Sequence, residues 1–212
     1  MKSSTSNLVV KQSSLTTVLK GATMNMKLTL LTITGLLFIP SSIVNAAGGY
    51  SSVKVLLGNK SLDSDWNKDD SMETIGLQST YYPASLPLGI ALDFYGSGNE
   101  DKINGVKVET TVGELNLGLR YSPTPIGGVV SPYLGGGLSY ASAELEQMIN
   151  GAKTKYEDKG VGYWIGGGIE YLFTEHWSIG ADVHYSNVDV ELNGEKRDAG
   201  GVSWAATIGY RF

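Results

Sequence analysis

The chain has 212 residues, a formal net charge of −5, two histidines and no cysteine. Without cysteine it can form no disulfide, no thiolate metal site, no cysteine nucleophile and no lipid-bearing N-terminal cysteine. Two histidines, His176 and His184, are too few for a histidine metal cluster, so we predict no metal and no cofactor.

The first 46 residues predict a segment that is removed by processing, so they are set apart from the fold. Met26 and Lys27 precede an apolar run from Leu28 to Pro40, and small residues follow up to Ala46. This order is typical of a secretory signal peptide. The run spans 13 residues, fewer than the roughly 20 of a membrane-spanning helix. We therefore assign 24–46 to a signal peptide, and 1–23 to an over-extended start or a long n-region.

The remaining residues, 47–212, are strongly acidic. All four charged residues before position 47 are lysines, so 12 of 16 basic and all 21 acidic residues remain, a net charge of −9. A nucleic-acid partner calls for a basic surface, and we exclude one. The 166 remaining residues are enough for one domain.

Alternation of apolar and polar residues recurs along this domain, which predicts β-strands. In ELNLGLRY, Leu115, Leu117 and Leu119 alternate with polar or small residues. The same pattern predicts eight strands, near 49–58, 74–82, 88–97, 108–122, 132–146, 160–173, 177–192 and 201–212.

The connections between these strands are of two kinds. Short or proline-containing connections at 83–87, 123–131 and 174–176 alternate with polar ones at 59–73, 98–107, 147–159 and 193–200. This meander with two unlike ends predicts an all-β fold, an eight-stranded antiparallel up-and-down barrel.

Two features favour a transmembrane barrel, with its apolar face outside. The polar face is crowded with small residues, as a narrow eight-stranded interior requires: Gly89, Ala91, Gly135, Gly137, Gly166, Gly168, Gly180 and Gly209. The apolar face carries aromatic residues near strand ends, as in a membrane-interface girdle: Tyr121, Tyr171, Phe173, Trp177, Tyr210 and Phe212. A secreted lipocalin-like or sandwich protein is the alternative, because alternation alone does not distinguish inside from outside.

The segments SPYLGGGLSYA, YWIGGGIEYLFTEHWSIGADVHYS and ATIGYRF make the domain similar to one family. It resembles the small OmpA-like, opacity-type outer-membrane β-barrels of Gram-negative bacteria, a porin-like family. The resemblance implies an integral outer-membrane protein with periplasmic termini, surrounded by outer-membrane lipids and lipopolysaccharide. The last strand is similar to the signal read by the barrel-assembly machinery, carried by Trp204, Ile208, Tyr210 and Phe212. No peptidoglycan-binding domain is expected after Phe212.

Charged residues on the polar face predict a closed ion-pair network inside the barrel, because buried charges must be paired. Its predicted members are Lys54, Asp93, Glu114, Arg120, Glu170, Asp182 and Arg211, with Glu170 near Arg211 or Arg120. Such a network would block large solutes. A narrow pore for small solutes is the alternative function that this lumen leaves open.

The stretch HYSN suggests an enzyme, because the lipid A deacylases that it resembles carry a His-x-Ser pair on the lipid-facing side of a strand. His184 and Ser186 match this pair, with Asp198 as a candidate third member. The strand parity, however, places His184 and Ser186 on the lumen side. A bulge after Asn187 could turn Ser186 outward. We predict no enzymatic activity and keep the deacylase as an alternative.

The outer connections are the remaining candidates for function. DSDWNKDD begins like a calcium loop at Asp63 but lacks the required glycine and final glutamate. Trp66 in the same loop is a candidate surface-contact residue. The strands 108–122, 132–146 and 177–192 exceed the roughly 9–11 residues needed to span a membrane, so we expect their outer ends to protrude. We predict a non-enzymatic structural protein whose surface serves adhesion or environmental contact, with a possible host or surface ligand.

Overall fold

The computed structural model describes residues 49–63, 71–103, 106–149, 152–192 and 194–212. The expected signal peptide and the segment before it lie outside these residues. The strands are β1 (Tyr50–Leu62), β2 (Ser71–Tyr82), β3 (Leu88–Ile103), β4 (Val106–Tyr121), β5 (Val130–Ile149), β6 (Ala152–Leu172), β7 (Trp177–Asn187), β8 (Asp189–Leu192), β9 (Glu195–Asp198) and β10 (Gly201–Arg211). No helix in this part of the chain is long and apolar enough to cross a bilayer.

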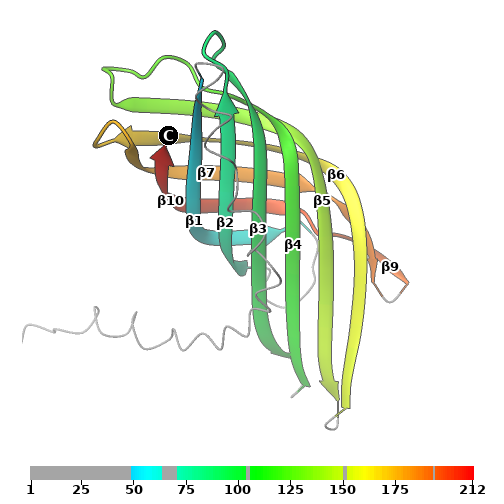
Figure 1. The fold of residues 1–212 in the computed structure, drawn as a ribbon. Helices are drawn as coiled ribbons and strands as arrows, with labels where there is room; N and C mark the ends of the chain where they lie inside the picture. Colours follow the sequence, from blue (N-terminus) through cyan, green and yellow to red (C-terminus); the bar gives the residue numbers. More distant parts are fainter. Residues whose placement is uncertain (1–48, 64–70, 104–105, 150–151, 193) are drawn as a thin grey trace, which may run out of the picture. The chain divides into compact units, whose positions relative to one another are not determined.

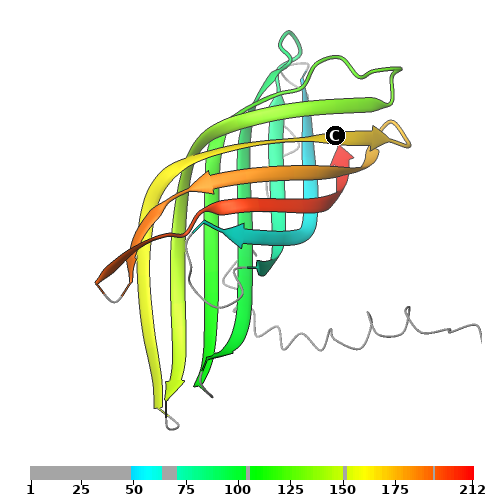
Figure 2. The same cartoon turned by 180° about the vertical axis from the view of Figure 1, so that it is seen from behind.

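Eight of the strands form a closed antiparallel barrel in the order β1-β10-β7-β6-β5-β4-β3-β2 (Figures 1 and 2). From β1 to β7 each strand pairs with the next strand along the chain. β7 then pairs with β10, and β10 closes the barrel on β1 in the register Val53↔Tyr210. The strands β8 and β9 form a separate two-stranded hairpin. The predicted eight-stranded up-and-down barrel is confirmed.

The barrel carries its apolar side chains outside. On β4, Leu117 and Leu119 are 55% and 50% exposed, whereas the residues that flank them, Asn116 and Arg120, are 0% and 1% exposed. The alternation therefore has the polarity of a membrane barrel, with an apolar outer surface and a polar lumen. A lipocalin-like protein with an apolar interior would show the opposite pattern.

Glycines on the lumen face leave room for large side chains. A Cβ atom added to Gly168 would lie 2.5 Å from the hydroxyl oxygen of Tyr133, and one added to Gly135 would lie 2.9 Å from the ring of Trp164. Both rings belong to the buried lumen layer. The small residues therefore fit the lumen side chains that face them.

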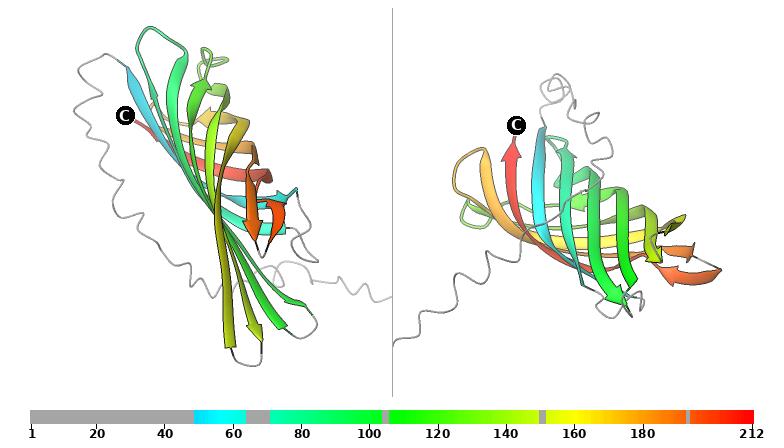
Figure 3. Two further views of the ribbon diagram at one scale, coloured as in Figure 1. Left: turned by 90° about the vertical axis from the view of Figure 1, so that its right-hand side faces the viewer. Right: turned by 90° about the horizontal axis from the view of Figure 1, so that it is seen from below.

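Four neighbouring strands extend well beyond the others (Figures 1 and 3). β5 and β6 have 20 and 21 residues, and β3 and β4 have 16 each, whereas β7 and β10 have 11. The predicted loops 98–107 and 147–159 are therefore wrong, because the paired strands continue to Ile103↔Val106 and Ile149↔Ala152. We call the part of β3–β6 that extends beyond the shorter strands, residues 97–103, 106–113, 142–149 and 152–160, the protruding sheet.

The predicted strand 177–192 is also wrong, since β7 ends at Asn187. The carboxylate of Asp198 accepts hydrogen bonds from the backbone nitrogens of Val188 and Gly200 at 2.9 and 2.7 Å, and from the Asn187 side chain at 2.5 Å. These bonds turn the chain out of the β7 register into the β8–β9 hairpin, and they replace the predicted loop 193–200 with a strand. In that hairpin Gly194 has a positive φ of 79°, which glycine adopts without strain.

Candidate functional site

The lumen is the first candidate site, and its charges are balanced. Among the described strands, four cationic side chains (Lys54, Lys60, Arg120 and Arg211) and four carboxylates (Asp93, Glu114, Glu170 and Asp182) point inward. An interior with equal numbers of opposite charges can pair them, and buried charges are tolerated only when paired.

One group of charges lies near the end with the short turns. Glu170 on β6 forms ion pairs with Lys54 on β1 and with Arg211 on β10, where Arg211 Nη2 lies 3.0 Å from Glu170 Oε2. The Lys54 ammonium also lies 3.6 Å from the centre of the Tyr133 ring. Two cations thus share one carboxylate where the closing strands meet.

A second pair lies deeper. Arg120 Nη2 on β4 lies 2.7 Å from Asp93 Oδ2 on β3, and both side chains are at most 1% exposed. Arg120 Nη1 also donates to Thr80 Oγ1 at 2.5 Å. These contacts fix the position of the guanidinium inside the lumen.

Asp182 on β7 is held by hydrogen bonds from neutral groups. The Tyr133 hydroxyl donates to its Oδ2 at 2.6 Å, and Gln78 Nε2 donates to the same oxygen at 3.1 Å. The Gln78 amide also donates to the Tyr95 hydroxyl at 2.8 Å. The bond from Gln78 on β2 to Asp182 on β7 crosses the lumen between strands that are not neighbours.

A third group contains the histidine and serine of HYSN. Glu114 Oε1 on β4 accepts a hydrogen bond from Ser186 Oγ at 3.2 Å and contacts the Lys60 ammonium, while Oε2 lies 3.6 Å from His184 Nε2. Asn116 Nδ2 lies 3.2 Å from the same histidine nitrogen. Glu114 therefore connects three strands.

This arrangement differs from a catalytic triad in two ways. Ser186 bonds Glu114 and not His184, whereas a serine nucleophile requires its base within hydrogen-bond reach. His184 and Ser186 are 2% and 0% exposed and face the lumen, so lipid does not reach them. The third candidate, Asp198, caps the β8–β9 hairpin instead. The break after Asn187 leaves Ser186 facing inward.

An apolar cluster closes the lumen above Glu114, at the end with the long hairpins. Its buried members come from five strands and from the residues that flank the β8–β9 hairpin: Leu62, Met72, Val112, Ala141, Ala143, Val188, Val190 and Ala199. The Lys60 ammonium donates to the carbonyl oxygen of Ala199 at 2.8 Å, which ties this cluster to the ion pair below it. Side chains therefore occupy both a polar and an apolar level of the lumen.

Several lumen residues were missing from the predicted network, among them Lys60, Gln78 and Tyr133. Lys60 was assigned to a loop, although it continues the inward even-numbered positions of β1 after Lys54 and Leu56. Continuing the inward and outward alternation two residues beyond the predicted strand end at 58 would have placed Lys60 in the lumen. Gln78 and Tyr133 were missed because the search considered charges alone.

The protruding sheet is the second candidate site, and its outer face is charged. On β6, Lys153, Lys155 and Lys159 point outward and are 58%, 46% and 55% exposed. They form ion pairs with Glu144, Glu146 and Glu157 at 2.6–3.4 Å. Hydrogen bonds from Lys155 and then Lys159 hold the pKa of Glu157 below its usual value.

The remaining predicted residues lie at the barrel surface or outside the described residues. Trp204, Ile208 and Phe212 are about half exposed on the outer face of β10 and beyond its end, and their role as an assembly signal remains a prediction. Trp66 and all of the acidic loop after Asp63 lie outside the described residues. Within the described ranges, no group of three or more acidic or histidine side chains could hold a metal ion.

A family model decides what this barrel is. The model described as the outer membrane protein beta-barrel domain matches residues 30–212. The chain belongs to this outer-membrane β-barrel family. It is therefore an integral protein of the outer membrane, and its short-turn end, where β1 begins and β10 ends, faces the periplasm.

Solved structures of other outer-membrane barrels share the fold. OprG of Pseudomonas aeruginosa is 17% identical with a TM-score of 0.58, and the match covers 77% of this chain and 96% of that one. Ail, the attachment invasion locus protein of Yersinia pestis, is 19% identical with a TM-score of 0.54, and the match covers 77% of this chain and 99% of that one. Neisserial surface protein A is 17% identical with a TM-score of 0.53, and the match covers 78% of this chain and 97% of that one. A search of curated proteins finds no match.

Proposed function

We propose that this outer-membrane barrel is a non-enzymatic structural protein whose protruding sheet contacts surfaces or ligands outside the cell. The observation that carries the proposal is the outward, charged face of that sheet, raised above the apolar belt on strands of 16 to 21 residues. A membrane-spanning strand needs only about 9–11 residues, so the additional length serves the space outside the membrane.

The sheet is suited to contact because its charges are held in fixed positions. Ordered strand pairs continue to Ile103↔Val106 and Ile149↔Ala152, so little conformational entropy is lost when a partner binds. Ail has also been solved in complex with the heparin analogue sucrose octasulfate. We therefore choose a sulfated glycan as the first probe, with Lys153, Lys155 and Lys159 as the contacts.

The two alternative functions have less support. A pore for small solutes would need an open lumen, whereas ion pairs and the apolar cluster fill the lumen between the described strands. A deacylase would need Ser186 at the lipid face with a hydrogen bond to its base. The buried position of Ser186 and its bond to Glu114 support a structural role.

Other partners follow from the location in the membrane. The exposed apolar belt contacts outer-membrane lipids, and we propose that lipopolysaccharide surrounds its outer rim, near the half-exposed rings of Tyr140, Tyr163 and Trp204. The barrel-assembly machinery is the proposed reader of the last strand. A host or environmental ligand is the proposed partner of the sheet.

The test shortens the protruding sheet without changing its register. One variant replaces residues 100–109 by Asn-Gly between the paired residues Asn99 and Thr110, and a second replaces 146–155 by Asn-Gly between Leu145 and Tyr156. Asn-Gly is the preferred sequence of two-residue hairpin turns. Bacteria that express each variant are tested for binding to immobilised heparin and to a cultured epithelial layer.

We expect the wild-type barrel to confer binding to at least one of these surfaces, and the second variant, which lacks Lys153 and Lys155, to reduce it most. A charge-matched control, Lys153→Gln with Glu146→Gln, separates sheet length from charge. Circular dichroism and protease resistance verify that each barrel is folded. Equal binding by the folded shortened variants, or no binding by the wild type, would refute the proposal.

A further inference from the structure

Exposed apolar side chains gather on two of the three short turns at the periplasmic end of the barrel (Figure 1). The β2–β3 turn, residues 83–87, contains Leu86, which is 55% exposed. The β4–β5 turn, residues 122–129, contains Ile126, which is 66% exposed, and Val129, which is also exposed. Single exposed apolar residues are ordinary, whereas a contiguous apolar patch marks a site of interaction.

These two turns form one surface with the ends of β3 and β4. The backbone nitrogen of Ser122 donates to the carbonyl oxygen of Pro87 at 2.8 Å, which joins the turns. Beside this bond Leu88 and Tyr121 pair directly across the two strands, and both side chains are exposed. We call the exposed residues of this surface the apolar rim: Leu86, Leu88, Tyr121, Ile126 and Val129.

The β4–β5 turn holds its part of the apolar rim in a fixed position. The backbones of Ile126 and Val130 exchange two hydrogen bonds, at 2.7 and 3.1 Å. The two glycines between them have positive φ angles of 60° and 78°, which glycine adopts without strain. The carbonyl oxygen of Val129 also accepts a bond from the backbone nitrogen of Leu172 on β6 at 2.8 Å. The ordered turn therefore loses little conformational entropy when its apolar side chains leave water.

The apolar rim is continuous with the lipid-facing belt. Residues 82–92 and 121–130 contain no charged residue. The next outward pair on the same two strands, Ile90 and Leu119, already belongs to the exposed apolar belt. If the membrane ended at this pair, the apolar rim would lie in water, at the cost of hydrating all of its apolar surface. Lipid that covers the belt can cover the rim as well, without crossing a polar boundary.

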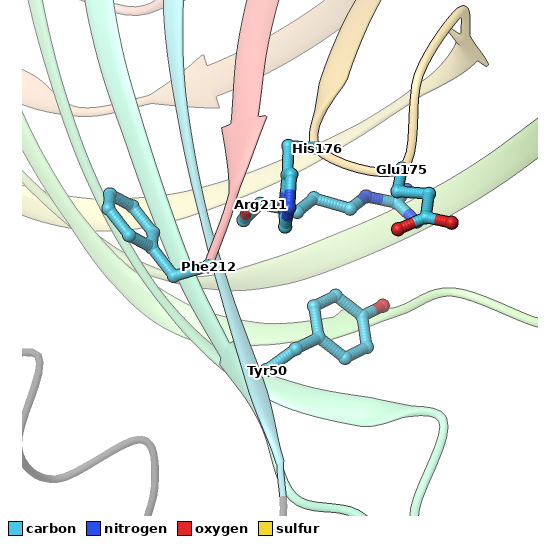
Figure 4. Close-up of a pocket in the computed structure, with 5 residues that line it drawn as sticks. All are labelled: Tyr50, Glu175, His176, Arg211 and Phe212. Carbon is cyan, nitrogen blue, oxygen red and sulfur yellow. Dashed lines mark hydrogen bonds between the residues drawn. The ribbon is translucent and has the colours of Figure 1, made fainter.

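The β6–β7 side of the same end is polar. Glu175 and His176 in the β6–β7 turn line an open pocket together with Tyr50, Arg211 and Phe212 (Figure 4). Both turn residues are exposed, and a charged side chain is costly to place in a membrane. The two sides of the periplasmic end therefore favour different surroundings, lipid at the β2–β3 and β4–β5 turns and water at the β6–β7 turn.

We infer that the apolar rim inserts into the inner boundary of the outer membrane, where phospholipid headgroups meet the acyl chains, and anchors the β3–β4 side of the barrel there. The apolar face of an interfacial helix lies about 5–10 Å deep in the same boundary. β3 and β4 also carry part of the protruding sheet. A tilt that lowered the sheet toward the membrane would push the rim into periplasmic water, so the anchor opposes that tilt. The inference does not depend on the proposed function, because it concerns the opposite end of the barrel.

Spin labels measure the depth of the rim, and the absence of cysteine from the chain allows labelling at one chosen position. Ile126→Cys and Glu175→Cys, each carrying a nitroxide, are reconstituted as full-length barrels in vesicles of phosphatidylethanolamine and phosphatidylglycerol. Electron paramagnetic resonance then gives the accessibility of each label to oxygen, which concentrates in lipid, and to a nickel chelate, which stays in water.

We expect the ratio of oxygen to nickel accessibility to be at least threefold higher for the label at 126 than for the label at 175. Equal ratios would place the apolar rim in water and overturn the inference. Shielding of the label at 126 from both reagents would overturn it too, because protein and not lipid would then cover the rim.

A second pair of variants tests whether the rim side chains cause the insertion. Leu86→Asn with Val129→Asn makes the rim polar, and Ser85→Asn with Thr124→Asn places the same residue at exposed polar neighbours in the same two turns. With the label at 126, we expect nickel accessibility to rise at least twofold in the first variant and to stay unchanged in the second. Circular dichroism verifies that both barrels are folded. Unchanged nickel accessibility in the folded rim variant would contradict the inference, whatever the behaviour of the shortened-sheet variants.

Discussion

The buried pair of Arg120 and Asp93 offers the sharpest test of the lumen. The substitution Asp93→Asn preserves the shape of the side chain and removes its charge, so the guanidinium loses its carboxylate at 2.7 Å and keeps Thr80 at 2.5 Å. Both partners are at most 1% exposed. Removing one partner of a buried ion pair costs about 3–5 kcal/mol because the other charge stays buried. We expect a loss of this size in the free energy of unfolding.

Two further variants separate the ion pair from the packing around it. Arg120→Met removes the cation and leaves Asp93 unpaired, and the double variant Asp93→Asn/Arg120→Met leaves no charge at all. Replacing both partners of a buried pair is often nearly neutral. We therefore expect the double variant to lose less stability than the sum of the two single losses, as for residues in direct contact.

Equilibrium unfolding in urea, followed by tryptophan fluorescence of the barrel in lipid vesicles, measures these losses from the midpoint and the slope. A loss below about 1 kcal/mol in Asp93→Asn would be typical of a solvent-exposed pair. It would refute the reasoning, because the lumen would then contain enough water to screen its charges. The interpretation of the lumen as closed would then also be wrong.

Three other predictions address packing, pH dependence and chemistry. Gly168→Ala should destabilise the barrel by about 1–3 kcal/mol, since the new Cβ would lie 2.5 Å from a tyrosine hydroxyl, whereas Gly113→Ala meets nothing within 4 Å and should cost no stability in the same urea assay. The pKa of Asp158 is lowered mainly by a hydrogen bond from the backbone nitrogen of Glu191 at 2.5 Å. This contact should be present above the usual aspartate value of about 3.9 and be lost as the pH falls through the lowered value. The Glu191 amide resonance should follow that titration, and Asp158→Asn should abolish it. Mass spectra of lipid A from cells that express the wild type or Ser186→Ala should be identical, and loss of an acyl chain with the wild type alone would establish a hydrolase.

Alternation predicted the inside and outside of the barrel well because one physical requirement acts on every spanning strand. Leu115, Leu117 and Leu119 must face lipid, so Glu114 and Asn116 must face the lumen, and no tertiary detail changes this assignment. The same argument correctly placed His184 and Ser186 inward. It could not identify their partners, because Glu114 and Lys60 come from strands that meet only when the barrel closes.

The predicted ends of the strands were wrong for a different reason. Above the membrane the outer face meets water, so the charged stretches around Glu100 and Lys155 resemble loops although they belong to strands. A local signal was present. Asn-Gly stands between Ile103 and Val106, between Ile149 and Ala152, and between Leu192 and Glu195, each time joining paired strands. Asn-Gly between apolar-alternating segments is a strong hairpin signal. It would have extended the predicted strands of β3 to β6 and would have predicted the β8–β9 hairpin.

The lumen contacts also constrain the order in which this barrel can assemble. Lys60 reaches a residue 54 positions away, Asn116 one 68 away, and Gln78 one 104 away. A single hairpin inserted into lipid would carry such groups without their partners, and contacts so distant in sequence make folding slow. Insertion must therefore be coupled to closure of β1 on β10. A partly inserted chain lies high in free energy, and the finished barrel is retained in the membrane by the height of that barrier.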